Sequence, residues 1–172
     1  EDSIKLNCNF EDGLNGYPGK MSFEVFYKIT SNRELNISFN VKSEKLTIAG
    51  PTSHPYFNLN LDQLENRHFL KLDTQYFTPK GNNDIPNGKI INTKNTSFDF
   101  SENTLINSYT NLDDNFILMD KDTTLQEKVY KTATLISYDK KIKLDVESNY
   151  PAIQVYTGQY LKEPFYPKQG IC

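Results

Sequence analysis

Apolar and polar side chains alternate along much of the chain, and a two-residue period of this kind predicts β-strands. The alternation is clearest over residues 21–29 and 35–41, where every second side chain is apolar and most of the others are polar or charged. A short polar link, Ser31-Asn32-Arg33, separates the two stretches. We therefore predict an antiparallel hairpin with one buried face and one face in water.

The same period recurs further along the chain. Residues 142–146 alternate in this way, and residues 128–138 are their expected antiparallel partner, with the turn at Asp139-Lys140. The segment 101–112 is too polar to assign. No capped helical pattern stands between the strands, so the prediction is an all-β fold, a large antiparallel β-sandwich. Its remaining strands are expected over residues 4–10, 67–72 and 152–160.

Length and composition indicate one domain. The chain has 172 residues, and 37% of them are hydrophobic, including 11 Phe and 11 Tyr, which is enough for one sizeable core. We expect residues 1–172 to form a single domain or part of one, because residues 4–10 and 170–172 both resemble strands of a longer fold. A net charge of −3 with no basic run argues against nucleic acid or an anionic membrane as partner, and no apolar run could span a bilayer.

The two cysteines, Cys8 and Cys172, lie near opposite ends of the sequence. A disulfide between them is allowed but nothing in their spacing requires it, so two free thiols in a reducing cytoplasm are the favoured interpretation. The sequence shows no metal-ligand spacing, and no metal site is expected.

Residues 52–59, Thr-Ser-His-Pro-Tyr-Phe-Asn-Leu, hold one of the two histidines. Read as a strand, this stretch places His54, Tyr56 and Asn58 on one face and apolar residues on the other. A polar, titratable row of this kind is typical of the floor of a polar binding cleft, although a histidine beside a proline also fits a purely structural role. The other histidine, His68, follows an arginine in a polar context and is expected at the surface.

Seven blocks of the sequence resemble, in order, the motifs of one known family. The octapeptide above is similar to Thr-Asn-His-x-Tyr-Phe-Asn-Leu, and Ala-Ile-Gln-Val-Tyr-Thr-Gly at 152–158 is similar to Gly-Val-Gln-Phe-Tyr-Thr-Gly. The family is that of the aldose 1-epimerases, or galactose mutarotases, whose fold is a large antiparallel β-sandwich. The other blocks are 11–19, 76–79 with 85–88, 97–100, 112–116 and 166–172.

The resemblance implies that the protein interconverts the α and β anomers of a free hexose such as galactose or glucose. Ring opening needs an acid for the ring oxygen and a base for the anomeric hydroxyl, and it needs no cofactor. His54 is the candidate general acid, since an imidazole titrates near neutral pH. The candidate substrate-binding residues are Asp113, Gln154, Asn58 and Tyr56, the last two in weaker, supporting roles.

Simpler interpretations of these residues stay open. Asp113 offers several acceptor sites to sugar hydroxyls, but it also lies in a polar cluster typical of a turn. Gln154 on a half-apolar strand can contact a hydroxyl or simply face water. If an aromatic ring stacks on the sugar, we expect it to be that of Tyr156 or Tyr109.

Parts of the family pattern are missing from the sequence. The earlier Leu-His-Gly-Gly region and the glutamate base that follows the match to Ile171-Cys172 are both absent, so we expect the middle portion of an enzyme. Asp114 and Ser53 replace a family His and Asn, and the change at Asp114 bears on substrate contacts near Asp113.

Two rival functions follow. If residues 1–172 are the complete protein, we expect little mutarotase activity, because the base is missing. A non-catalytic sugar-binding or structural β-sandwich is then favoured. A hexose 6-phosphate epimerase is disfavoured because Arg33 and Arg67 are the only arginines and neither lies in a matched block. Besides the hexose, the expected partner is the remainder of a longer polypeptide or a second copy of the chain.

Overall fold

The computed structural model describes residues 2–62, 65–118 and 128–161. The chain divides into two compact units, residues 1–56 (unit 1) and 57–172 (unit 2), and each is described by itself. The described residues form β-strands and two single 3₁₀ turns, η1 (Leu14–Gly16) and η2 (Ser108–Thr110), so the predicted all-β class is confirmed. No helix among them is long and apolar enough to cross a membrane.

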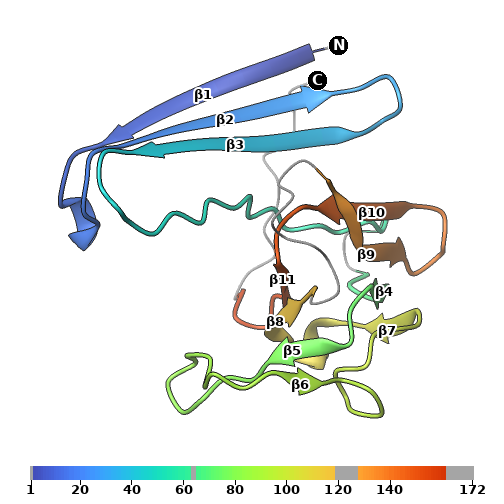
Figure 1. Ribbon diagram of the computed structural model, residues 1–172. Coiled ribbons are helices and arrows are strands. Elements are labelled where there is room, and N and C mark those ends of the chain that lie inside the picture. The colour runs from blue at the N-terminus through green and yellow to red at the C-terminus, as the bar shows by residue number, and fades with distance from the viewer. Residues whose placement is uncertain (1, 63–64, 119–127, 162–172) are drawn as a thin grey trace. The chain divides into compact units, whose positions relative to one another are not determined.

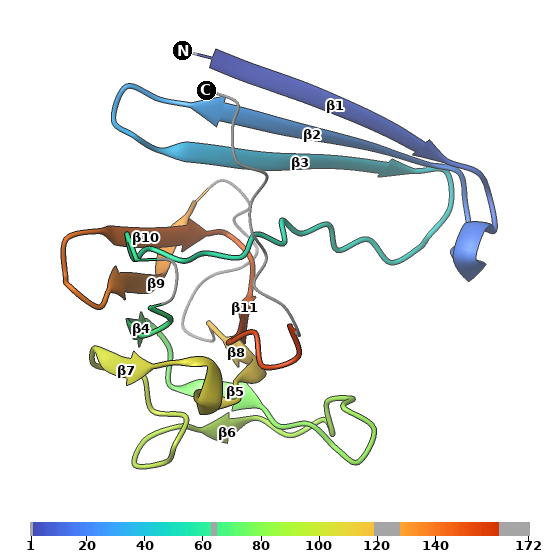
Figure 2. The same ribbon diagram turned by 180° about the vertical axis from the view of Figure 1, so that it is seen from behind.

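Unit 1 is built on a three-stranded antiparallel sheet in the order β1-β2-β3, as both Figure 1 and Figure 2 show. The strands are β1 (Asp2–Phe10), β2 (Met21–Ile29) and β3 (Leu35–Ser43). In the central strand Val25 pairs with Leu6 on one side and with Phe39 on the other, so the apolar rows meet on one face. The pairing of the hairpin predicted from residues 21–41 is confirmed, but its expected buried face is not, because Met21 is the only buried residue of β2 and β3.

The turn that leads into β2 is closed by Asp12. Its carboxylate accepts a hydrogen bond of 2.6 Å from the Gly19 N–H and forms an ion pair with Lys45. Gly19 has φ +88°, and a Cβ there would lie 2.8 Å from the Lys45 backbone nitrogen. Only glycine fits this position, because an L side chain would meet both a steric clash and an unfavourable backbone angle.

Unit 2 contains two four-stranded antiparallel sheets (Figure 1). The first runs in the order β10 (Lys143–Ser148), β9 (Tyr130–Ser137), β4 (His68–Leu72) and β7 (Thr104–Ile106). The second runs in the order β11 (Ala152–Tyr156), β8 (Asp113–Ile117), β5 (Tyr76–Thr78) and β6 (Ile91–Asn92). The β9–β10 hairpin is the one predicted from residues 128–146.

The two sheets of unit 2 share one apolar core. Leu70 and Leu72 enter it from β4, and Phe77 and Phe116 enter it from β5 and β8. Phe116 has no exposed surface, and the Phe100 ring meets it edge to face with centroids 6.1 Å apart. Because β8 and β11 lie next to each other in the second sheet, side chains on their polar face are carried by strands anchored in this core.

The thiol of Cys8, on β1, is exposed and free, whereas Cys172 lies outside the described residues.

Candidate functional site

Asp113 and Gln154, two of the predicted binding residues, lie side by side on neighbouring strands. β11 pairs with β8 so that Tyr156 is opposite Asp113, and Gln154 is its diagonal neighbour on the same face. The Gln154 amide, through Nε2, donates a hydrogen bond of 2.9 Å to Asp113 Oδ1. The turn environment that the polar cluster suggested for Asp113 is wrong, because the residue begins strand β8.

Lys80 completes this group, and no sequence motif pointed to it. It follows the block at 76–79, and its Nζ lies 2.9 Å from Asp113 Oδ2 and 3.8 Å from Asp84 Oδ1. The hydrogen bond from Lys80 is the main cause that lowers the pKa of Asp113, and the same bond raises the pKa of Lys80. Asp113 is therefore ionised at neutral pH, with each of its oxygens held by a different donor.

An open pocket of about 520 Å³ lies beside this group. Its volume is in the range of small-molecule sites. The described part of its wall is polar and combines carboxylates, amides and one ammonium group, which suits a ligand rich in hydroxyls. Its lining residues are Lys80, Asp84, Asn111, Asp113, Asp114, Gln159 and Tyr160.

Two tyrosines stand near the same pocket. Tyr160 lines it and stacks on Tyr156, with ring centroids 6.4 Å apart and an interplanar angle of 19°. The Tyr160 N–H donates to the Tyr156 hydroxyl at 2.9 Å. Tyr109, the other ring considered for stacking, is 86% exposed and does not line the pocket.

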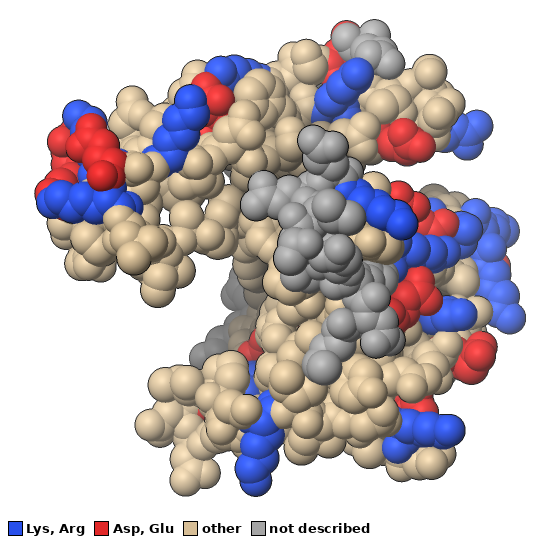
Figure 3. Space-filling view, in the orientation of Figure 1, with Lys and Arg blue, Asp and Glu red and all other residues tan. Residues whose placement is uncertain are grey.

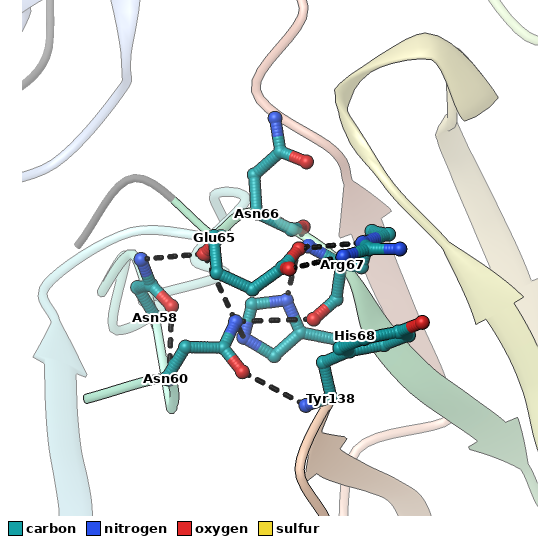
Figure 4. Close-up of polar contacts among 7 residues, drawn as sticks. All are labelled: Asn58, Asn60, Glu65, Asn66, Arg67, His68 and Tyr138. Atoms are coloured by element: carbon teal, nitrogen blue, oxygen red, sulfur yellow. Dashed lines mark hydrogen bonds and ion pairs between the residues drawn. The ribbon is translucent and has the colours of Figure 1, made fainter. Parts of the chain in front are cut away.

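Asn58 lies in a different polar cluster, shown in Figure 4. Its Nδ2 donates to the Glu65 carbonyl at 3.3 Å, and its Oδ1 accepts from the Asn60 N–H at 3.0 Å. The Asn60 amide continues the network to the Arg67 carbonyl and to the Tyr138 N–H. Both ends of the Asn58 side chain are therefore bound to local backbone groups, and Asn58 does not line the pocket beside Asp113.

His68 is at the centre of this cluster, and the prediction that it lies at the surface is wrong. It is 7% exposed, because the period of β4 places it on the same face as the core residues Leu70 and Leu72. Its Nε2 accepts the Leu59 N–H at 3.1 Å, so the proton is on Nδ1, which donates to the Asn66 carbonyl at 3.2 Å. Burial lowers the pKa of His68 and keeps the ring neutral.

The polar neighbour that misled this prediction, Arg67, directly precedes β4. Its guanidinium donates to Glu65 at 2.8 and 2.5 Å and lies 3.7 Å above the centroid of the Tyr138 ring (Figure 4). The bidentate pair lowers the pKa of Glu65 to about 2.

His54 and Tyr56 belong to unit 1. Residues 52–59 join none of the described sheets, so the interpretation of this stretch as a strand is wrong. Pro55 explains part of the difference, because it lacks the N–H that a ladder needs. The side chains at alternate positions 54 and 56 still lie close together: the centroids of the exposed His54 ring and the Tyr56 ring are 5.0 Å apart.

Among the described residues no three His, Cys, Asp or Glu side chains are grouped as metal ligands.

Comparison with known proteins decides the family. The sequence model of the aldose 1-epimerases matches residues 1–172. The chain belongs to the aldose 1-epimerase family. This confirms the resemblance drawn from the seven sequence blocks.

Curated members of the aldose 1-epimerase family align with nearly the whole chain. The aldose 1-epimerase of Haemophilus influenzae is 30% identical over 173 residues, which cover 94% of this chain and 49% of the relative. The aldose 1-epimerase of Escherichia coli is also 30% identical, covering 94% and 51%. Human galactose mutarotase is 26% identical, covering 92% and 47%. The chain thus spans about half the length of these relatives.

Solved structures of aldose 1-epimerase relatives share the fold. The galactose 1-epimerase from Lactobacillus acidophilus superposes with a TM-score of 0.76 at 27% identity, covering 92% of this chain and 47% of that one. An aldose epimerase homologue from Caenorhabditis elegans also gives 0.76, at 21% identity, covering 90% and 48%. The predicted mutarotase-like β-sandwich is confirmed.

Proposed function

We propose that the protein is an aldose 1-epimerase that interconverts the α and β anomers of free hexoses such as galactose or glucose. The observation that carries the proposal is the Asp113 carboxylate, held by Gln154 and Lys80 at the wall of a polar pocket, in a chain of this family. The same proposal places the protein in the cytoplasm, where the exposed thiol of Cys8 stays reduced.

Asp113 binds hydroxyl groups of the sugar. A carboxylate has about four lone-pair sites. Gln154 occupies a site on Oδ1 and Lys80 a site on Oδ2, so each oxygen keeps an acceptor site for a sugar hydroxyl. Two hydroxyls on neighbouring carbons can then donate to one carboxylate.

The charge of the pocket favours neutral sugars. Among its described lining residues, Asp84, Asp113 and Asp114 are carboxylates and Lys80 is the one ammonium group. A phosphorylated hexose would bring a dianion toward this net negative wall and would be repelled. A free hexose meets no such cost.

The reaction itself needs one proton donated and one removed. His54 is proposed as the acid that protonates the ring oxygen while a base takes the proton of the anomeric hydroxyl. The ring opens to the aldehyde, the C1–C2 bond rotates, and the reverse transfers close the ring on the other face. We assign the base to none of the described residues.

Two further elements complete the proposal. Asn58 and Tyr56 support the segment that carries His54. Residues 1–172 act as one domain or part of one, with the hexose as ligand and the rest of a longer polypeptide or a second copy as protein partner.

Polarimetry on freshly dissolved α-galactose and α-glucose tests the function. The protein should accelerate the approach to anomeric equilibrium beyond the spontaneous rate, and His54→Gln should lower this acceleration at least ~100-fold, the usual contribution of a general acid. Asn32→Ala, a change in an exposed turn of the same unit, is the control.

The outcomes separate the candidate functions. If the protein binds sugar but does not accelerate mutarotation, it is a sugar-binding module and not an enzyme. If His54→Gln keeps full activity, His54 is not the general acid.

A further inference from the structure

We propose that Lys80 is a positioning residue of this sugar site: it fixes the direction of the Asp113 carboxylate for the incoming hydroxyls. The inference rests on the proposed function, since it concerns the same site. It adds a residue that stands outside the motif blocks from which the other candidates were drawn.

The backbone holds Lys80 at a defined place. It follows Pro79 at the end of β5, and it forms an isolated β-bridge with Pro86 across the loop. The loop is closed on either side of this bridge, because the Gly81 N–H donates to the Ile85 carbonyl at 2.7 Å and the Asn87 N–H donates to the Pro79 carbonyl at 3.0 Å. The root of the Lys80 side chain is therefore fixed.

The side chain is directed at one carboxylate. Its ammonium group lies 2.9 Å from Asp113 and 3.8 Å from Asp84, and the side chain of Asp84 is 91% exposed whereas that of Lys80 is 24% exposed. The contact with Asp113 is shorter and less exposed to solvent, so it is the stronger of the two. Lys80 therefore interacts mainly with Asp113, and Asp84 adds only a weak attraction from the solvent side.

Two donors, one on a strand and one in a loop, define the plane of the carboxylate. Gln154 on β11 holds Oδ1 and Lys80 beyond β5 holds Oδ2, both at 2.9 Å. With one donor the carboxylate can rotate about its last side-chain bond, and sugar binding then has to restore the order that Lys80 provides in advance. Asp113 is 39% exposed at its side chain, so this ordering is not supplied by packing.

The titratable groups around Asp113 give Lys80 a second effect. Asp114 on the same strand, Asp84 in the loop and Tyr160 after β11 line the pocket with it. Of the charged groups among these described lining residues, only Lys80 is positive. Removing it leaves Asp113 among like charges, which raises the pKa of Asp113.

Four variants test the inference: Lys80→Met, Lys80→Arg, Asp113→Asn and the double variant Lys80→Met/Asp113→Asn. Lys89→Met is the matched control, an exposed lysine in the same β5–β6 connection. The KM and the dissociation constant for galactose are measured with each, the unfolding midpoint checks the fold, and an NMR titration follows the Asp113 carboxyl.

Lys80→Met should raise the KM and the dissociation constant about 5- to 10-fold, the loss expected when a half-exposed charged hydrogen bond is removed. The kcat should change less than twofold, and the Asp113 carboxyl should titrate at higher pH. Lys80→Arg should recover most of the affinity, and Lys80→Met should add nothing in the Asp113→Asn background. Lys89→Met should change none of these quantities.

The results distinguish the inference from the function on which it rests. If Asp113→Asn weakens galactose binding and Lys80→Met does not, Lys80 has no positioning role and the inference is overturned. If Asp113→Asn also leaves binding unchanged, the sugar site has been placed wrongly and both proposals are overturned.

Discussion

The neutral imidazole of His68 is hydrogen-bonded to the backbone at Leu59, in the chain that follows His54. Its unprotonated Nε2 accepts the Leu59 N–H at 3.1 Å, and its Nδ1–H is used by the Asn66 carbonyl at 3.2 Å. Protonation of the ring would turn the acceptor into a donor facing another N–H. The tautomer is therefore part of the structure, and acid should disrupt it.

We predict that the free energy of unfolding falls as the pH is lowered below about 6.5, the ordinary pKa of histidine. Burial depresses the pKa of His68 in the folded state, so between that value and about 6.5 the unfolded chain binds a proton that the folded chain does not. This contribution is complete above the unfolded pKa and is lost as the pH falls through the folded one. Urea unfolding at a series of pH values measures it.

Two substitutions at His68 test the role of Nε2 as the acceptor of the Leu59 N–H. Gln can place an oxygen near the position of Nε2 and keep the bond to Leu59, whereas Asn keeps a donor near Nδ1 and loses that bond. At pH 7.5 His68→Asn should cost about 1–3 kcal/mol and His68→Gln clearly less. Equal losses in both variants, or a wild-type pH dependence that survives in His68→Gln, would refute this role.

The sequence could suggest Asp113 and Gln154 because both stand in short motif blocks. It could not suggest Lys80, whose significance comes from contact with a residue 33 positions away. It misplaced His68, because the charged neighbour outweighed the two-residue period that runs from His68 through Leu70 to Leu72. Along a strand the period is the better guide to burial than the adjacent residue.

Among the elements, the turn before β2 depends most strictly on one residue type. Gly19 combines φ +88° with a backbone atom of Lys45 2.8 Å from where a Cβ would stand. We predict that Gly19→Ala lowers the free energy of unfolding by about 1–3 kcal/mol.

Gly50→Ala is the matched change, because a Cβ at Gly50 meets nothing within 4 Å and its φ is ordinary. It should alter stability by less than about 0.5 kcal/mol. Thermal or urea unfolding of the two variants decides the point, and equal stabilities would show that the turn adapts at no cost.

The alternating strands were predictable and the irregular pieces were not. The β2–β3 and β9–β10 hairpins follow from period and turn residues alone. β7 escaped notice because it has only three residues and depends on pairing with β4, a contact that local sequence does not contain. Residues 52–59 alternate without forming a strand, since a period describes the faces of an extended chain and does not supply a pairing partner.

At the scale of the whole molecule, the charges fit a protein that binds a small neutral ligand. Lys and Arg atoms lie interspersed with Asp and Glu atoms on the face shown in Figure 3. Such mixing gives no extended field of one sign on that face, in keeping with the net charge of −3. Under the proposed function, recognition depends on local groups such as Asp113 and its two donors.

The proposed function requires that His54 and the Asp113–Gln154 pair act on the same hexose. The most direct test is an NMR titration of isotope-labelled protein with galactose that follows the His54 imidazole and the Gln154 side-chain amide together. The account predicts that both signals shift with the same dissociation constant and that Asp113→Asn weakens both to the same extent. A Gln154 signal that responds while His54 stays unchanged at saturation would contradict it.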